Sequence, residues 1–128
     1  MTIADSRYIS FTTFRRTGAA VATPVWVAPM PDGRLAFTTA AEAGKVKRLA
    51  HTSRVEIRPC DARGRVAEGS AIRQGQAVVV REGADYHAGV AAMQRKYGIQ
   101  FRVVHLGSMT KRRLGRGDNA VVTVTLDA

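Results

Sequence analysis

The stretch that decides the fold reads Leu35-Ala36-Phe37-Thr38-Thr39-Ala40-Ala41-Glu42-Ala43-Gly44-Lys45-Val46-Lys47-Arg48-Leu49. It begins as an apolar strand that ends in two hydroxyl side chains, passes through a turn and opens a helix with cations. The first backbone N–H groups of a helix have no partner within the helix, and the helix dipole favours an anion beside them. The pattern therefore predicts a strand-turn-helix junction that holds an anion.

Four positions of this junction are candidate ligands of a phosphate group. We expect the hydroxyls of Thr38 and Thr39 and the ammonium of Lys45 to converge on it. Gly44 lacks a Cβ atom and would let the phosphate approach the backbone closely. The glycine-rich fingerprints of Walker loops and of dinucleotide-binding folds do not occur in the sequence. Another kind of phosphorylated ligand is therefore indicated.

Short β-strand patterns dominate the rest of the chain. Strands are predicted over residues 7–14, 19–28, 34–39, 54–58, 71–81, 102–106 and 120–126, and helices over residues 42–51 and 84–97. Tight turns separate the first three strands, so we expect a hairpin of the first two and three antiparallel strands in sequence. Six or seven short antiparallel strands with two helices fit a mainly β protein, a small β-barrel.

The composition is that of a single globular domain over residues 1–128, with 45% hydrophobic and 23% charged residues. The one cysteine, Cys60, has no partner for an internal disulfide, and no stretch is apolar enough to span a membrane. We therefore expect a cytoplasmic location. The HExxH pattern is missing too, and no metal site is predicted.

A large excess of positive charge narrows the choice of partners. The 20 Lys and Arg residues against 10 Asp and Glu residues give a formal net charge of +10. A field of this sign attracts nucleic acid, anionic lipid or a small molecule with several negative charges. A basic surface also aids solubility, so the charge alone leaves these possibilities open.

Four segments, in a fixed order, carry a resemblance to a known family. They are Thr23-Pro24-Val25-Trp26, Phe37-Thr38-Thr39, Gly44-Lys45-Val46-Lys47-Arg48-Leu49 and Val55-Glu56-Ile57-Arg58-Pro59-Cys60-Asp61-Ala62-Arg63-Gly64. Together they resemble the split β-barrel family of pyridoxamine 5'-phosphate oxidase-like flavoproteins, and more closely its branch that uses the deazaflavin coenzyme F-420. The resemblance implies an antiparallel split β-barrel of the FMN-binding type. It also implies a homodimer with the cofactor site near the subunit interface.

The resemblance assigns cofactor-binding positions in this sequence. The ring of the cofactor would lie along the strand residues Val21, Ala22, Thr23, Pro24, Val25 and Trp26. The phosphate or the ribityl chain would be bound by Thr38, Thr39, Gly44 and Lys45, and the phosphate or an acidic tail by Lys47 and Arg48. No catalytic residue is assigned. In hydride transfer to a small unsaturated organic substrate, the accompanying proton would come from water, Tyr97, His87 or His105.

Charge favours one cofactor over the other. Flavin mononucleotide (FMN) carries one phosphate, whereas coenzyme F-420 carries a phosphodiester and several carboxylates, which suit a chain of formal net charge +10. The first alternative is an FMN-binding flavoprotein of the same family. The second is a non-catalytic basic β-barrel that binds nucleic acid, which requires aromatic side chains on an exposed basic sheet. Most of the eight aromatic residues stand at positions that look internal, so nucleic acid is the weaker alternative.

Overall fold

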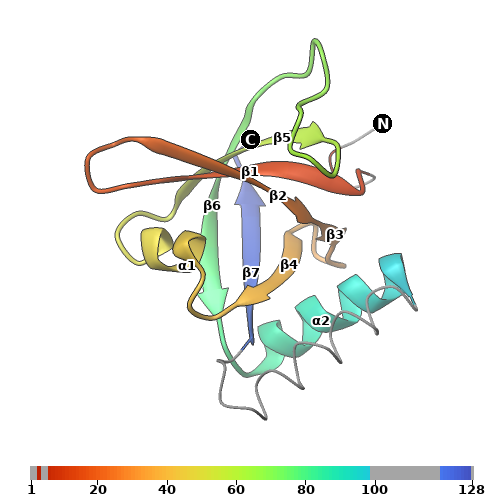
Figure 1. The fold of residues 1–128 in the computed structure, drawn as a ribbon. Helices are drawn as coiled ribbons and strands as arrows, with labels where there is room; N and C mark the ends of the chain where they lie inside the picture. The colour runs from red at the N-terminus through yellow and green to blue at the C-terminus, as the bar shows by residue number, and fades with distance from the viewer. Residues whose placement is uncertain (1–2, 4–5, 99–118, 128) are drawn as a thin grey trace.

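In the residues described by the computed structural model, which are 3, 6–98 and 119–127, one antiparallel sheet of seven strands curls into a split barrel (Figure 1). The strands are β1 (Tyr8–Phe14), β2 (Ala20–Trp26), β3 (Ala28–Pro29), β4 (Leu35–Ala40), β5 (Arg54–Cys60), β6 (Arg73–Val80) and β7 (Asn119–Leu126). The helices are α1 (Gly44–Leu49) and α2 (Ala84–Tyr97). The predicted mainly β split barrel is confirmed. The strand predicted over residues 102–106 lies outside the described residues.

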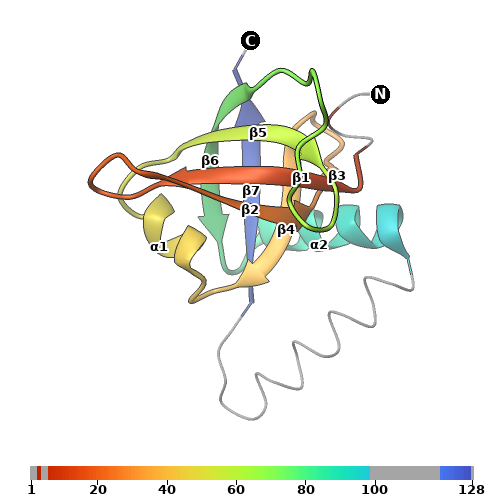
Figure 2. The same cartoon turned by 45° about the horizontal axis from the view of Figure 1, so that its top comes forward.

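The order of the strands across the sheet is β2-β1-β5-β6-β7-β4-β3. Strands β1 and β2 form the predicted hairpin, and β4 pairs antiparallel with β3, as expected of consecutive strands. The strand predicted over residues 19–28 is broken at Val27 into β2 and β3, and β4 also pairs with β7. Strands β2 and β3 form the two edges of the sheet, although only Val27 separates them in sequence. The chain therefore passes from one edge to the other at a single bend. Figure 2 shows β1, β2 and β5 running across β6 and β7.

Alternating side chains fill the barrel. Phe11 of β1 and Phe37 of β4 are fully buried and meet edge to face, with ring centroids 4.8 Å apart. Helix α2 covers the outer face of β4 and β7 (Figure 1). A Cβ atom at Gly89 would lie 2.5 Å from Cγ1 of Val121, so the glycine permits this close packing. No helix in the described part of the chain has the length and apolar character needed to cross a membrane.

The last turn of α2 holds the bend between β2 and β3. The Val27 N–H donates a hydrogen bond to the Tyr97 hydroxyl oxygen at 3.0 Å, and the Lys96 ammonium donates to the Val27 carbonyl at 2.7 Å. The Tyr97 ring stacks on Trp26, with centroids 4.9 Å apart. The helix ends at Tyr97, where the sequence predicted its end, and Gly98 follows with a φ of 59° in the left-handed region. Sheet closure therefore depends on α2.

Candidate functional site

Helix α1 is the centre of the candidate site. It is shorter than the predicted helix over residues 42–51, and no side chain caps its first turn. Val46 and Leu49 are buried and anchor it to the barrel, while Lys47 is exposed. Lys45 and Arg48 are partly buried and three residues apart, a spacing that puts them on one face of the helix.

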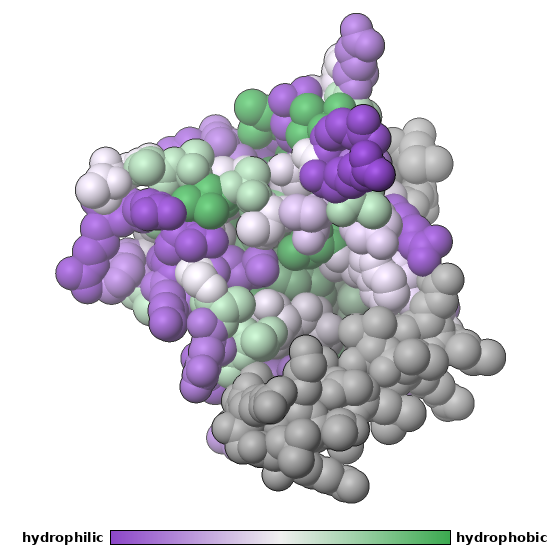
Figure 3. Space-filling view, viewed as in Figure 1, coloured by the Kyte–Doolittle hydropathy of each residue, from purple (hydrophilic) through white to green (hydrophobic). Residues whose placement is uncertain are grey.

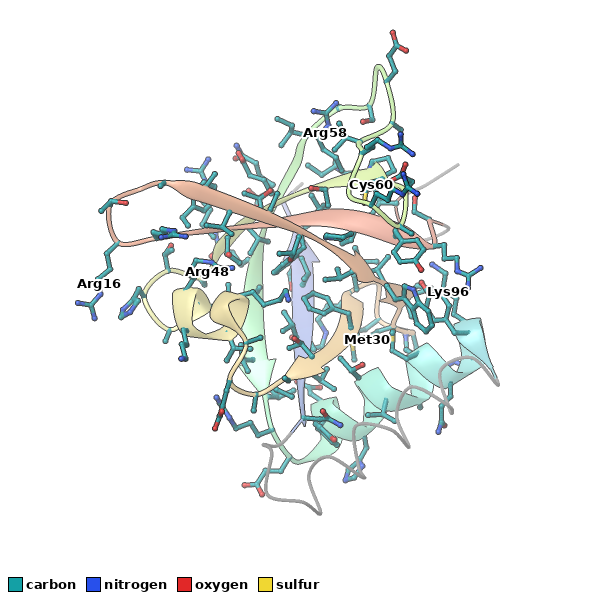
Figure 4. The ribbon with its side chains drawn as sticks, viewed as in Figure 1. Arg16, Met30, Arg48, Arg58, Cys60 and Lys96 are labelled. Carbon is teal, nitrogen blue, oxygen red and sulfur yellow. The ribbon has the colours of Figure 1, made fainter. Side chains whose placement is uncertain are left out.

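Arg48 reaches from α1 to the hairpin of β1 and β2 (Figure 4). Its Nε–H donates a hydrogen bond to the hydroxyl of Thr13 on β1, at 2.5 Å, and Thr13 is only 1% exposed. A Cβ atom at Gly44 would lie 2.8 Å from Nη1 of Arg48. The space above Gly44 that was expected to admit a phosphate thus holds the guanidinium group. A bound anion would meet Arg48 at this position.

Lys45, Lys47 and Arg48 form what we call the α1 cationic cluster. No Asp or Glu among the described residues forms an ion pair with any of the three, since the ion pairs found there involve other cations. Burial, followed by the charge of Arg48, lowers the pKa of the Lys45 ammonium. Hydrophilic side chains gather over α1 and the hairpin tip at the left of Figure 3. The cluster is therefore a site of positive potential that favours an anion.

The two threonines at the end of β4 lie apart. The strand continues through Ala40, so the side chains of Thr38 and Thr39 project to opposite faces of the sheet. Thr38 pairs with Val121, which faces α2, whereas Thr39 pairs with Ala120 on the barrel side. The two hydroxyls therefore do not converge on one phosphate.

In the predicted ring-binding strand, residues 21–26, side chains alternate between the barrel interior and an exposed face. Thr23 stands opposite the buried Phe11 and thus faces the barrel interior, while Ala22 and Pro24 are exposed on the other face. The Oγ1 atom of Thr23 is buried and is the one such side-chain atom of the described residues that lacks a hydrogen-bond partner. Trp26, the last residue of β2, stacks on Tyr97. An unpaired hydroxyl of this kind needs an explanation, and a ligand is one.

Thr13 is the residue that the sequence analysis missed. Its signal is the alternation of Ile9, Phe11 and Thr13 on one face of β1, which places a hydroxyl in line with two core side chains. Its partner Arg48 lies 35 residues away, and only the fold brings the two together. Thr13 also stands directly opposite Val21 of β2, next to the candidate ring-binding strand.

The candidate proton donors have other roles or lie elsewhere. The hydroxyl of Tyr97 is bound to the backbone of Val27 and Arg7, and burial raises its pKa. His87 is exposed on α2, edge-on to Tyr86. His105 lies outside the described residues. The structure therefore singles out no proton donor among them.

Three cavities lie beside the predicted cofactor residues without including any of them. One of about 310 Å³ lies between α1 and β6, lined by Val46, Ala77 and Arg81 among others. A second, of about 450 Å³, adjoins Cys60, and a third, of about 240 Å³, lies on the outer face of β1 and β5. Burial and the nearby Asp61 charge raise the pKa of the Cys60 thiol, so the thiol is not activated.

The curled antiparallel sheet with α1 at its open end defines a class of split β-barrel proteins. The family model described as pyridoxamine 5'-phosphate oxidase matches residues 2–127, and the chain belongs to this family. No curated protein matches the chain.

Solved structures with this fold carry different names. HutZ, a heme storage protein from Vibrio cholerae, is 13% identical with a TM-score of 0.66, and the match covers 95% of this chain and 82% of HutZ. An F420 reductase is 14% identical with a TM-score of 0.62, over 98% of this chain and 91% of that one. An FMN-binding protein related to pyridoxamine 5'-phosphate oxidase from Nostoc punctiforme is 10% identical with a TM-score of 0.58, over 97% and 72%. These likenesses establish the fold, and the fold alone does not select a cofactor.

Proposed function

We propose that this protein is an oxidoreductase that binds the deazaflavin coenzyme F-420 and transfers hydride to or from a small unsaturated organic substrate. The observation that carries the proposal is the α1 cationic cluster, with which no carboxylate of the described residues forms an ion pair. A ligand with a phosphodiester and several carboxylates matches such a cluster better than a ligand with one phosphate. The formal net charge of +10 supports the same choice, and an F420 reductase is among the solved structures that share the fold.

The residues present fit this coenzyme at three places. Arg48 and Lys45 would hold the phosphodiester, because a guanidinium and an ammonium on one helix face supply charge-assisted hydrogen bonds. The buried, unpaired hydroxyl of Thr23 would gain a partner from a ring that lies along β2. Lys47, exposed on the same short helix, would meet the acidic tail.

When bound, the coenzyme would supply the carbon that gives or accepts hydride. The chain would bind, orient and shield it. Val21, Thr23 and Val25 are the half-buried positions on one face of β2, and a flat ring beside them would be shielded from water on one side. The cations of α1 would fix the other end of the molecule, so that the ring has one position relative to the substrate. This division of labour requires no nucleophilic side chain.

Two further expectations go with the proposal. We propose a homodimer with the cofactor site near the subunit interface, since Val66, Ile72 and Val78 are large apolar side chains that are 41%, 53% and 57% exposed. Light scattering that gives the mass of one chain would contradict the dimer. Nucleic acid is disfavoured as a partner because none of the aromatic side chains in the described residues is exposed. A filter-binding assay with single-stranded and duplex DNA tests this point.

The decisive experiment titrates the purified protein with oxidised F-420 and, separately, with FMN. We expect tighter binding of F-420, with an affinity that falls as salt rises. The Lys45→Ala variant should weaken F-420 binding by about 1–3 kcal/mol, because a charge-assisted contact is lost. Arg73→Ala is the matched control, since it removes an exposed cation from β6. An equal loss of F-420 affinity in both variants would mean that only the overall charge of the protein matters, and not the position of Lys45. Tight FMN binding with no F-420 binding would make the protein an FMN-binding flavoprotein.

A further inference from the structure

The hydrogen bond between Thr13 and Arg48 is the best-defined polar contact of the candidate site. Thr13 lies on the inner face of β1, is 1% exposed, and accepts its hydrogen bond from Nε–H of Arg48 at 2.5 Å. The buried hydroxyl of Thr13 thus accepts a hydrogen bond from a charged group. Such a bond fixes the side chain of an arginine more firmly than a bond between neutral groups.

The contact leaves most of the guanidinium group available. An arginine carries five N–H donors, and Thr13 uses the one on Nε. The donors on Nη1 and Nη2 have no hydrogen-bond or ion-pair partner among the described residues. Nη1 lies over Gly44, 2.8 Å from where a Cβ atom would stand. The fork of free donors is therefore held at the start of α1, close to Lys45.

We propose that Thr13 is a positioning residue, which fixes the guanidinium of Arg48 before an anionic phosphate ester binds to its Nη1 and Nη2 donors. The proposal rests on the proposed function, since the phosphodiester of F-420 is the anion in question. Arginine has one of the largest side-chain rotamer entropies, and a side chain that is ordered before binding loses less on binding. Thr13 would therefore contribute to affinity without touching the ligand.

A purely structural role is the competing explanation. A buried hydroxyl needs a partner, and Arg48 supplies one whether or not an anion ever binds. The two explanations differ in what Thr13→Val does in a protein that already lacks Arg48. If Thr13 acts through Arg48, the second substitution changes nothing further in anion affinity. If Thr13 only supports the fold, its effect is independent of Arg48.

The test is a double-mutant cycle with two probes, F-420 and inorganic pyrophosphate. We expect Thr13→Val to weaken binding of both probes about fivefold, and Thr13→Ser, which keeps the hydroxyl, to restore the affinity. Thr13→Val in an Arg48→Ala background should have no further effect. Thr12→Val is the matched control, because Thr12 stands on the opposite face of β1 and does not contact Arg48. The Nε–H resonance of Arg48 in ¹⁵N NMR should shift in Thr13→Val and not in Thr12→Val.

The remaining outcomes each decide a question. Unchanged affinity in Thr13→Val, an equal loss in the Arg48→Ala background, or no rescue by Thr13→Ser overturns the positioning role. If Thr13→Val does not fold, the affinity of Thr13→Ser and the NMR shift of the Arg48 Nε–H decide alone. An Arg48 Nε–H that is not hydrogen-bonded in the wild type would then overturn the positioning role. Binding of pyrophosphate without F-420 removes the proposed coenzyme but leaves the positioning role to be judged on pyrophosphate. Binding of neither probe overturns both.

Discussion

Gly44→Ala separates affinity from stability at the candidate site. The new Cβ atom would lie 2.8 Å from Nη1 of Arg48, while ordinary contact distances are about 3.5 Å or more. The guanidinium must therefore move by roughly 1 Å, which the end of a flexible side chain does at little cost. The backbone of Gly44 has no left-handed φ, and alanine favours a helix over glycine by up to about 1 kcal/mol. The folded protein should be as stable as the wild type or slightly more stable.

Affinity should change in the opposite direction. A guanidinium displaced by roughly 1 Å loses alignment with Thr13 and with a bound phosphate, which we expect to cost about 1 kcal/mol, or roughly fivefold in Kd. Urea denaturation measures the first effect, and titration with F-420 or pyrophosphate measures the second. A loss of more than about 1 kcal/mol of stability with unchanged affinity would refute the reasoning, because it would place the clash in the fold instead of in the guanidinium.

Three more outcomes follow from other contacts. Gly89→Ala should cost about 1–3 kcal/mol of stability in urea denaturation, because its Cβ would lie 2.5 Å from the buried Val121, and anion affinity should stay the same. Tyr97→Phe leaves the Val27 N–H without its acceptor and should cost about 1–3 kcal/mol; a change within error would mean that water replaces the hydroxyl. Anion binding should be accompanied by proton uptake at alkaline pH, because the pKa of Lys45 is lowered in the free protein and a bound anion raises it. Calorimetry in two buffers of different ionisation enthalpy measures this uptake, which Lys45→Met should abolish.

Local patterns predicted the strands and helices well, but only some of the strand pairs. The alternation in residues 7–14 and the apolar run in residues 34–39 are properties of each segment and are read directly from the sequence. The position of β4 beside β7 depends on contacts between residues far apart in the chain, and no turn signal encodes it. The sequence therefore predicted the antiparallel pairs of consecutive strands, but neither the break at Val27 nor the pairing of β4 with β7.

The candidate site was predicted in part for the same reason. Lys45 was predicted because a cation in the first turn of a helix suits an anion, and Arg48 because the family resemblance assigns it. The expected convergence of Thr38 and Thr39 is wrong because the two are neighbours within one strand, and neighbouring strand side chains project to opposite faces of the sheet. The space beside Gly44 that was predicted for a phosphate is occupied by the guanidinium of Arg48. Thr13 belongs to the site only through a contact across 35 residues, which sequence patterns do not encode.

The bend at Val27 sets a condition on how the chain reaches its final form. The strands on either side of Val27 become the two margins of the sheet, and the groups that hold the bend, at Lys96 and Tyr97, follow 69 and 70 residues later. During synthesis both margins are therefore made long before the residues that fix them, and each presents unpaired backbone groups in the meantime. Contacts this distant in sequence form late because the intervening loop must close first. Strand β7, which joins β6 to β4, is made after α2, so the nascent protein is exposed to wrong strand pairing until both α2 and β7 have emerged.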